Sequence, residues 1–352
     1  MIKRKQTRKV KVGNIYIGGD ASIVVQSMAN TKTSNIQATV KQIHDLEKSG
    51  CELIRIAVPD MQSAQCISKI KSQINIPLVA DIHFSADLAI ESIKQGIDKL
   101  RINPGNIFPK EKISDIARLC KQKNIPIRIG INGGSLEPKI LKKYHNKTTA
   151  EGMAESAINH IKILEKYNFK DIVISVKASD INRTVKAYQI LSERTKYPLH
   201  LGITEAGTKF RGTIVSSIGI GTLLHQGIGD TIRVSLTDNP LEEIPVAWEI
   251  LSALNIRHRG PQITSCPTCG RTEIDLVKLA HDVEHIAKDF TKPIHIAVMG
   301  CVVNGPGEAR EADLAIVGGK KVGLICRKGK IIARVSENKL LNEFKKILNN
   351  EN

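Results

Sequence analysis

The chain has 352 residues, 41% hydrophobic and 25% charged, the mixture of a soluble globular protein, and its length favours one large barrel or two domains. No apolar run of about 18 residues is present, which excludes a membrane-spanning helix. The formal net charge of +17 favours anionic partners, namely nucleic acids, phosphorylated small molecules or acidic proteins, although isolated surface lysines account for part of it.

The N-terminal segment predicts a β-hairpin. The stretch "RKVKVGNIYIGGD" alternates apolar and polar residues around Gly13 and Asn14, and we expect this hairpin to plug the floor of a barrel. The first residues, "MIKRKQTRKV", are basic and lack the apolar run of a signal peptide. We therefore expect a cytoplasmic protein whose seven cysteines are reduced, so that a cysteine cluster binds metal rather than forming a disulfide.

One pattern then repeats eight times: a short β-branched run, followed by a helical stretch. The strand-like runs are Ile23–Asn30, Glu52–Val58, Pro77–His83, Lys99–Asn103, Pro126–Asn132, Asp171–Lys177, Pro198–Thr204 and Thr231–Leu236. Gly50 and Gly96 stand where two of the helices should end. Eight alternating units predict an α/β fold, the (β/α)8 TIM barrel, with a doubly wound open sheet as the alternative.

Basic residues gather at the carboxyl ends of these strands, where barrel enzymes carry their chemistry. The cations are Arg55, Arg101, Arg128, Lys177 and Arg233. Five like charges at one mouth repel one another unless an anion joins them, and guanidinium groups match phosphate oxygens. The pattern therefore predicts a site for a polyanionic small molecule.

Other polar residues accompany these cations. They are Asp81, His83, Asn103, Asn132 and Ser235, together with the loops "NPGN" and "NGGS". His83 follows Asp81 by two residues, so both side chains lie on one side of the strand. Glu205 is an acid among the bases, and two roles remain open for it: proton transfer, or charge balance for Arg233.

After Trp248 the repeating strand–helix pattern ends, and a second domain is expected. A helix-like run, "EIDLVKLAHDVEHIAKDF", precedes a strand at Pro293–Gly300, two further strand-like runs and a final helix. We expect a barrel with its hairpin over residues 1–250 and a small α+β domain over residues 251–352.

The second domain carries a Cys-x-x-Cys pair, Cys266 and Cys269, and a third cysteine, Cys301. Such pairs serve zinc sites, redox dithiols and iron–sulfur clusters. A structural zinc site has four ligands. The next cysteine, Cys326, lies in a strand-like segment, where a cysteine side chain usually packs in the core. Glu308 follows Cys301 across a Gly-Pro-Gly turn, and three cysteines with one unusual ligand favour an iron–sulfur cluster. The remaining cysteines, Cys51, Cys66 and Cys120, are expected to be structural.

Nine short motifs together resemble one enzyme family. They are "VVQSMANT", "RIAVP", "LVADIHF", "LRINPGN", "SVKASD", "LGITEAG", "GIGDTIRVSL", "SCPTCGR" and "MGCVVNGPGEA". This combination resembles the bacterial 4-hydroxy-3-methylbut-2-enyl diphosphate synthases of the methylerythritol phosphate pathway to isoprenoids. The resemblance runs from the hairpin to beyond residue 310, with no large insertion between the two domains.

The resemblance implies a reaction and a cofactor. The family opens 2-C-methyl-D-erythritol 2,4-cyclodiphosphate by a two-electron reduction with loss of water, which yields 4-hydroxy-3-methylbut-2-enyl diphosphate. The electrons pass through a [4Fe–4S] cluster held by three cysteines and one glutamate. In this chain the matching positions are Cys266, Cys269, Cys301 and Glu308.

The resemblance also implies roles at the barrel mouth. The diphosphate would be clamped by Arg55, Arg101, Arg128 and Lys177, and the substrate oriented by Asn132, Arg233, Ser235 and, beside the cluster, Asn304. Glu205 would be the proton donor. Members of the family act as homodimers, in which the cluster domain of one chain caps the barrel of the other. Flavodoxin or ferredoxin would supply the electrons.

Two other functions remain as alternatives. One is a zinc-stabilised phosphosugar or pterin-type barrel enzyme without redox chemistry. The other is a zinc-ribbon protein that binds nucleic acid, which the low aromatic content of 3% disfavours because few side chains are available for base stacking.

Overall fold

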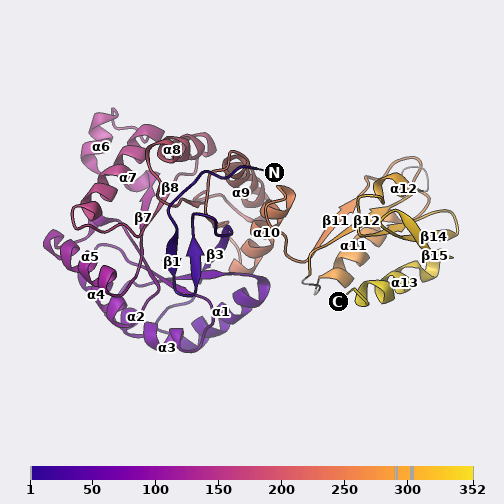
Figure 1. The fold of residues 1–352 in the computed structure, drawn as a ribbon, viewed down its shortest axis with the longest axis horizontal. Helices are drawn as coiled ribbons and strands as arrows, with labels where there is room; N and C mark the ends of the chain where they lie inside the picture. Colours follow the sequence, from indigo (N-terminus) through magenta and orange to yellow (C-terminus); the bar gives the residue numbers. More distant parts are fainter. Residues whose placement is uncertain (1, 289, 291, 302–304, 352) are drawn as a thin grey trace. The chain divides into compact units, whose positions relative to one another are not determined.

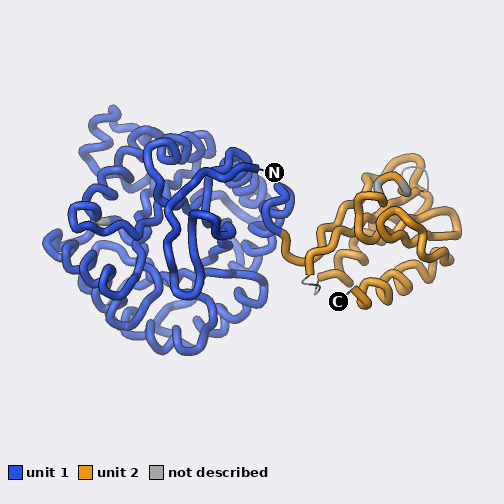
Figure 2. Tube along the Cα trace, in the orientation of Figure 1, with its two compact units in different colours: residues 1–257 blue, residues 258–352 orange. Residues whose placement is uncertain are grey.

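The chain folds into two compact units, Met1–Arg257 and His258–Asn352 (Figure 2). The structure is a computed structural model that describes residues 2–288, 290, 292–301 and 305–351. The first unit extends past residue 250, where the sequence placed its end. Both terminal nitrogens of Arg257 bond the carboxylate of Glu52 at 2.8 Å, and its guanidinium lies 4.7 Å from the ring centroid of Trp248, so this residue belongs to the barrel.

Eight parallel strands form the barrel, in the order β8-β7-β6-β5-β4-β3-β10-β9. They are β3 (Val24–Met28), β4 (Leu53–Ala57), β5 (Leu78–Asp81), β6 (Lys99–Ile102), β7 (Ile127–Asn132), β8 (Ile172–Lys177), β9 (His200–Leu201) and β10 (Thr231–Ile232). A parallel bridge between Ile174 and Leu199 joins β8 to β9 and closes the barrel. The predicted (β/α)8 architecture is confirmed, and the open sheet is excluded.

Helices surround the strands as a ring (Figure 1). They are α1 (Ile36–Ser49), α2 (Met61–Gln65), α3 (Ile67–Lys71), α4 (Ala86–Lys94), α5 (Ile113–Gln122), α6 (Pro138–Lys143), α7 (Ala150–Glu165), α8 (Ile181–Arg194), α9 (Lys209–His225) and α10 (Glu243–Ala253). The main apolar core lies between this ring and the outward strand residues, such as Ile54, Ile129 and Ile174. Gly50 ends α1 in the left-handed conformation, as predicted. Cys51 and Cys120 are buried in the core.

The N-terminal hairpin closes one end of the barrel. Strands β1 (Val10–Val12) and β2 (Ile15–Ile17) pair antiparallel around Gly13. Their apolar side chains pack against Val24, Leu53, Val79 and Val173, which lie near the amino ends of four barrel strands. The predicted plug of the barrel floor is therefore confirmed, and the opposite, carboxyl end remains as the mouth.

The second unit is a five-stranded sheet in the order β11-β12-β13-β14-β15. Its elements are β11 (Pro261–Ser265), α11 (Leu276–Ala287), β12 (Ile294–Met299), α12 (Gly305–Glu308), β13 (Leu314–Val317), β14 (Val322–Arg327), β15 (Lys330–Ser336) and α13 (Glu337–Asn349). Strands β11 to β13 are parallel, and β13 to β15 antiparallel. Strand residues alternate between faces, so Ile296 packs with α11 and α13, whereas Ala297 packs on the other face, where Ala309 follows α12.

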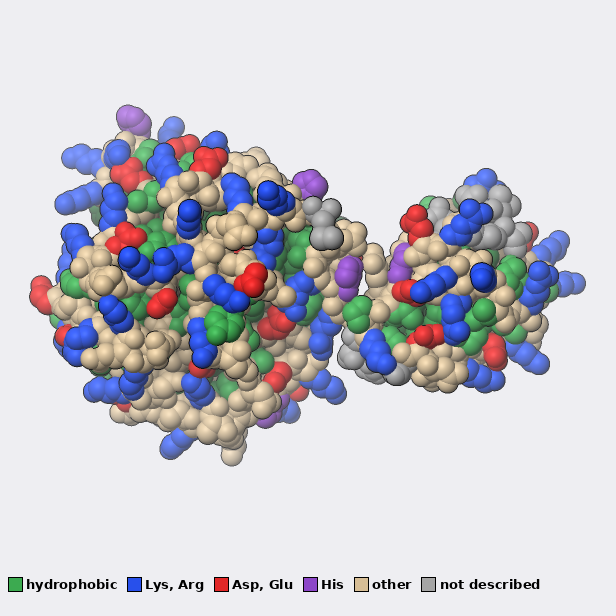
Figure 3. Space-filling model, viewed as in Figure 1, with side chains coloured by type: hydrophobic (Ala, Val, Ile, Leu, Met, Phe, Trp, Pro, Cys, Tyr) green, Lys and Arg blue, Asp and Glu red, His purple; other side chains and the backbone are tan. Residues whose placement is uncertain are grey.

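Charged side chains are scattered over the visible surface of each unit, with Lys and Arg interspersed among Asp and Glu (Figure 3). No helix in the described part of the chain is long and apolar enough to cross a membrane.

Candidate active site in the barrel and the cysteine edge

The interior of the barrel is lined by cations. Arg101 on β6 pairs in register with Arg128 on β7, Arg55 lies on β4, and Lys177 ends β8. The side chains of Arg101, Arg128 and Lys177 are buried. The structure thus brings together the four basic residues that the sequence singled out as a clamp.

Asp81 at the end of β5 is the negative centre of this group. Its Oδ1 accepts a hydrogen bond from Nη1 of Arg101 at 3.0 Å, and its Oδ2 lies 3.8 Å from Nε of Arg55. Nε2 of His83, two residues later, lies 2.9 Å from the same Nη1 of Arg101. Burial alone would raise the pKa of Asp81, but Arg55, His83 and Arg101 together hold it well below its usual range. One carboxylate therefore orients two guanidinium groups.

Many N–H donors in the barrel remain without a partner. Among the described residues, buried nitrogens without a hydrogen-bond partner include Nε of Arg101, Nε and Nη1 of Arg128, Nε of Arg233 and Nζ of Lys99. Buried donors in proteins are nearly always satisfied, so unpaired donors of cationic groups mark a place for an acceptor. Several of them line one interior, which fits an oxygen-rich anion.

Lys177 belongs to a second hydrogen-bond network inside the barrel. Its Nζ lies 3.2 Å from Nε2 of His200 on β9, and Nδ1 of His200 lies 2.6 Å from Oγ1 of Thr231. Burial, followed by Arg128 and other cations, lowers the pKa of both Lys177 and His200 well below their usual ranges. In the neutral form His200 accepts at Nε2 from Lys177 and donates at Nδ1 to Thr231.

Two glycines make room for these side chains. A Cβ on Gly130 would collide with the guanidinium of Arg101, and a Cβ on Gly202 would lie 2.6 Å from Nζ of Lys177. Gly130 lies on β7 and Gly202 directly follows β9, and the missing side chain at each position leaves space for the neighbouring cation. The long basic side chains fit the barrel because their neighbours lack side chains.

Arg233, just after β10, has a carboxylate partner that the sequence interpretation missed. Its Nη2 lies 3.6 Å from Oε1 of buried Glu243 on α10, and Oε2 of Glu243 accepts from Ser27 at 3.1 Å. Of the two roles left open for Glu205, charge balance for Arg233 belongs instead to Glu243 among the described residues. Glu205 is exposed, lies in the loop after β9 with φ of 56°, and has no ion-pair partner among the described residues. Its role in proton transfer stays a prediction.

The remaining predicted residues lie at the mouth, with one exception. Asn132 ends β7 beside Lys177 on β8, and Ser235 is half-buried two residues beyond Arg233. Asn103 follows β6, and its Oδ1 is buried without a described partner. Asn304 lies outside the described residues.

Cys266 and Cys301 follow the carboxyl ends of two neighbouring parallel strands. Ser265 on β11 pairs with Val298 on β12, so both chains leave the sheet at the same edge. Gly300 joins them: its N–H donates to Sγ of Cys266 at 3.3 Å, and its carbonyl accepts from the N–H of Glu273 at 3.1 Å. The loop that carries exposed Cys269 is thus anchored to Gly300 at both ends.

Helix α12 follows Cys301 in the chain. The N–H of Gly305 donates to the carbonyl of Cys301 at 3.2 Å, and Glu308 is the last residue of this short helix. All seven cysteines are free thiols. Iron–sulfur clusters are held by cysteine thiolates, whose sulfurs accept hydrogen bonds from nearby N–H groups. The cysteines at this end of the sheet are therefore of a type that fits such a cluster. Among the described residues, however, no three His, Cys, Asp or Glu side chains are gathered closely enough to hold a metal ion.

Cys326 packs elsewhere in the unit. It is buried on β14 in the apolar cluster that contains Ala315 and Val317, and burial raises the pKa of its thiol. The structure therefore places Cys326 in the packing role that its strand-like segment predicted. A zinc site with Cys326 as the fourth ligand receives no support from this placement.

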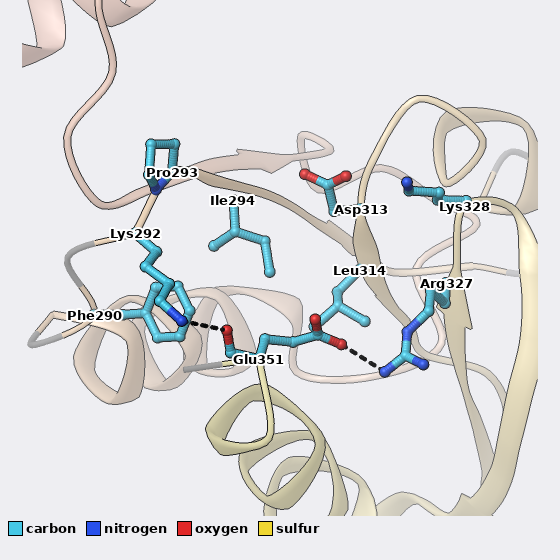
Figure 4. Close-up of a pocket in the computed structure, with 9 residues that line it drawn as sticks. All are labelled: Phe290, Lys292, Pro293, Ile294, Asp313, Leu314, Arg327, Lys328 and Glu351. Atoms are coloured by element: carbon cyan, nitrogen blue, oxygen red, sulfur yellow. Dashed lines mark hydrogen bonds and ion pairs between the residues drawn. The ribbon is translucent and has the colours of Figure 1, made fainter.

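A separate pocket of about 370 Å³ lies in the second unit (Figure 4). It opens between the start of β13 and the end of β14, at the end of the strands opposite to the one that the cysteines follow. Its carboxylates are already engaged, because Asp313 accepts from the N–H of His295 at 3.0 Å and Glu351 pairs with Arg327. We assign this pocket no part in the site.

The sequence interpretation missed several interior residues. Lys99, His200 and Glu243 are buried, and the first two lie in strand-like runs that the sequence identified without singling out these residues. Lys99 precedes Arg101 by two residues, and His200 precedes Gly202 by two. The two-residue period of an inward strand face could have found both. Glu243 carried no such signal, because it reaches the barrel from a helix.

Comparison with known proteins identifies the family. The profile of the GcpE TIM-barrel domain matches residues 7–248, and that of the GcpE protein C-terminal domain matches residues 262–350. The chain belongs to the GcpE family. The resemblance seen in the sequence motifs is confirmed, and so is the division of a GcpE chain into a barrel and a smaller domain.

Curated GcpE relatives match over nearly the whole chain. A Clostridium perfringens protein named 4-hydroxy-3-methylbut-2-en-1-yl diphosphate synthase (flavodoxin) is 56% identical over 347 residues, which cover 99% of both chains. Proteins of the same name from Caldanaerobacter subterraneus and Geobacillus thermodenitrificans are 56% and 51% identical, and cover 98% of this chain.

Solved structures with similar folds are more distant. Dihydropteroate synthases from Stenotrophomonas maltophilia and Burkholderia cenocepacia have TM-scores of 0.52, with 11% and 12% sequence identity. Each match covers 71% of this GcpE chain and at least 96% of the solved chain. At this identity the likeness shows the barrel fold alone, so it carries no argument for pterin chemistry.

Proposed function

We propose that this chain is a flavodoxin-dependent 4-hydroxy-3-methylbut-2-en-1-yl diphosphate synthase, an oxidoreductase of isoprenoid biosynthesis. It converts 2-C-methyl-D-erythritol 2,4-cyclodiphosphate to the linear diphosphate by two-electron reduction and loss of water. A relative that is 56% identical over 99% of both chains carries the name of this activity. The observation in the structure that supports it best is a barrel interior whose buried cationic donors lack acceptors.

Substrate binding rests on the interior cations. The unpaired N–H groups of Arg101 and Arg128 would donate to diphosphate oxygens, and Lys177 would add an ammonium charge from β8. Asp81 holds Arg55 and Arg101 in place before the ligand arrives, so little reorganisation accompanies binding. Asn132, Arg233 and Ser235 at the mouth would orient the rest of the substrate.

The electrons require a cofactor that this chain can hold. Cys266, Cys269, Cys301 and Glu308 would be the ligands of a [4Fe–4S] cluster, which supplies one-electron steps when bound. The N–H of Gly300 supports the sulfur of Cys266, and hydrogen bonds of this kind adjust the reduction potential of a cluster. A carboxylate ligand leaves its iron more open to substrate than a fourth thiolate would.

Loss of the hydroxyl group as water requires a proton. We assign this proton to Glu205, which lies in the loop at the carboxyl end of β9 and is reached by solvent. Its backbone lies in the left-handed region, with φ of 56°, a conformation that side-chain-bearing residues rarely adopt and that occurs at functional loops. Reprotonation from water after each turnover is possible because the side chain is exposed.

The protein would act as a homodimer in which the cluster-binding unit of one chain covers the barrel of the other. Exposed apolar side chains support an interface between copies. Phe210, Ile214 and Ile218 follow each other at one-turn spacing along α9, with exposed fractions of 81%, 45% and 52%. Phe84 and Phe108, in loops after β5 and β6, are also exposed. Apolar stripes of this kind mark protein interfaces.

Anaerobic purification tests the proposal. We expect a brown protein with about four irons per chain and turnover of the cyclodiphosphate with reduced flavodoxin. Glu308→Ala should lower iron content or turnover, whereas Glu311→Ala, three residues away on the exposed surface, should change neither. A colourless protein with one zinc per chain and no reductive turnover would contradict the proposal and favour the zinc-stabilised alternative.

A further inference from the structure

Lys99 is a buried lysine that the binding scheme above does not use. It is the first residue of β6, its side chain is fully buried, and it lies in register with Val79, which packs on the hairpin at the barrel floor. Arg101 follows two residues later on the same side of the strand, nearer the mouth. Lys99 therefore lies inside the barrel, on the floor side of Arg101, and pairs in register with the same Val79 that faces Arg55 on β4.

The ammonium group of Lys99 has nothing to hold it. Its Nζ has no hydrogen-bond partner among the described residues. The charged and titratable groups that line the interior with it are Arg55, Asp81, Arg101, Arg128, Lys177, His200, Arg233 and Glu243. Both carboxylates in this set are engaged, Asp81 by Arg55 and Arg101, and Glu243 by Arg233. Within the described part of the barrel, no carboxylate is left to pair with Lys99.

This environment favours the neutral amine when no ligand is present. Burial, followed by repulsion from Arg128 and Arg55, lowers the pKa of Lys99 well below its ordinary range. Guanidinium groups keep their charge, so the lysine is the group that gives up its proton to relieve the repulsion. Lys177 differs, because His200 offers its Nζ an acceptor at 3.2 Å.

We propose that Lys99 is a further residue of the diphosphate site, which takes up a proton from solvent when a diphosphate binds at the mouth and stabilises the bound anion from beneath. The step forms one N–H bond at Nζ, takes the proton from water or buffer acid, and transfers no electrons. Lys99 does not contact the ligand. Its positive charge adds to those of Arg128 and Arg55 and stabilises the anion electrostatically at a distance. This inference rests on the proposed function, because that function supplies the diphosphate.

Proton uptake predicts a pH dependence of binding. Where Lys99 is neutral in the free protein and charged in the complex, affinity falls by about tenfold for each unit of rising pH, because one proton binds together with the ligand. A variant that cannot bind this proton loses that part of the dependence. The ionisation of the ligand itself is common to both proteins and cancels in the comparison.

The test is isothermal titration of the anaerobic holoprotein with inorganic pyrophosphate and with the cyclodiphosphate. Titration at one pH, in buffers of different ionisation enthalpy, gives the number of protons taken up. We expect Lys99→Met to take up about one proton fewer than the wild type. The control is Lys94→Met, an exposed lysine at the end of α4, which should match the wild type.

Folding of the variants is checked by thermal unfolding followed by circular dichroism. Methionine leaves no polar group unpaired at this position, so Lys99→Met should be at least as stable as the wild type without ligand. If Lys99→Met does not fold, Lys99→Ala replaces it in the same titration. The neighbouring binding residues are unchanged in both variants, so binding itself is retained at lower affinity.

The outcomes separate this inference from the proposed function. Binding with equal proton uptake in wild type and Lys99→Met, or with none in the wild type, overturns the role of Lys99 and leaves the proposed function intact. Absence of binding by both ligands overturns both. Uptake in the wild type that falls by about one proton in Lys99→Met, and not in Lys94→Met, supports the inference.

Discussion

Arg101 and Asp81 face each other across β6 and β5, and Nη1 of Arg101 donates to Oδ1 of Asp81 at 3.0 Å. Both side chains are more than nine-tenths buried, so their charges meet away from water. The pair fixes one guanidinium of the predicted clamp, while its Nε has no hydrogen-bond partner in the described part of the chain. Asp81 thus orients Arg55 and Arg101 without neutralising all the cations of the barrel.

Replacement of Asp81 by Asn should destabilise the barrel. Loss of a buried partner leaves Arg55 and Arg101 uncompensated, and we expect the free energy of unfolding at pH 7 to fall by about 3 kcal/mol. The pKa of Asp81 is depressed in the folded state, so its stabilisation is present above pH of about 4 and is lost as the pH falls. Urea unfolding from pH 7 to pH 3 should therefore show the difference between wild type and Asp81→Asn shrinking.

The control for Asp81→Asn is Asp87→Asn. Asp87 pairs with Lys112 on the surface, with 60% of its side chain exposed, so its loss should change stability by less than about 1 kcal/mol. Equal effects of the two substitutions would contradict the central role of Asp81.

Gly130→Ala should impair catalysis without a large loss of stability. The added Cβ would meet Nε and Nη2 of Arg101 and push the guanidinium away from Asp81. Displacement of a binding group by about 1 Å costs on the order of 100-fold in rate. Steady-state kcat/KM for the cyclodiphosphate measures this, and Gly134→Ala, whose Cβ would meet nothing within 4 Å, should behave as the wild type. A Gly130→Ala enzyme with wild-type kcat/KM would show that Arg101 does not act in the reaction.

The cysteines should differ sharply in reactivity in protein from which iron has been removed. Cys269 is exposed, whereas Cys51 and Cys120 are buried in the barrel core. Burial raises the pKa of Cys51 to about 12 and also raises that of Cys120, so little thiolate forms at either. After brief treatment with iodoacetamide, peptide mass spectrometry should find Cys269 modified and the two barrel cysteines intact. Modification of Cys51 or Cys120 in folded protein would contradict the structure.

Arg257→Met should weaken the barrel although the residue lies beyond position 250. The substitution removes a bidentate ion pair with Glu52 and a hydrogen bond to the carbonyl of Ile23. We expect the free energy of unfolding to fall by about 2 kcal/mol, because hydrogen bonds of charged groups contribute more than neutral ones. Differential scanning calorimetry should show a lower midpoint for the barrel unit. Arg118→Met, which breaks an exposed pair with Asp115, is the matched control and should leave that midpoint unchanged.

Much of the barrel could be predicted from local sequence. The eight strands and the hairpin at Gly13 each follow from patterns of a few residues, because alternation and turn chemistry are local properties. Strand β11 escaped prediction, because "PQITS" is short and only partly buried at the edge of its sheet. The end of the barrel at Arg257 also escaped, because its ion pair joins residues 205 positions apart.

The sequence by itself determined which cations lie on inward strand faces and which cysteines end neighbouring elements, because both depend on the two-residue period of a strand and on motif spacing. Only the tertiary structure decided which acids balance those cations. Glu243 rather than Glu205 pairs with Arg233, because α10 turns its first residue into the barrel while the loop after β9 leaves Glu205 in solvent. The burial of Lys99 without a partner was likewise set by closure of the sheet, which brings strands far apart in sequence around one enclosed and largely cationic space.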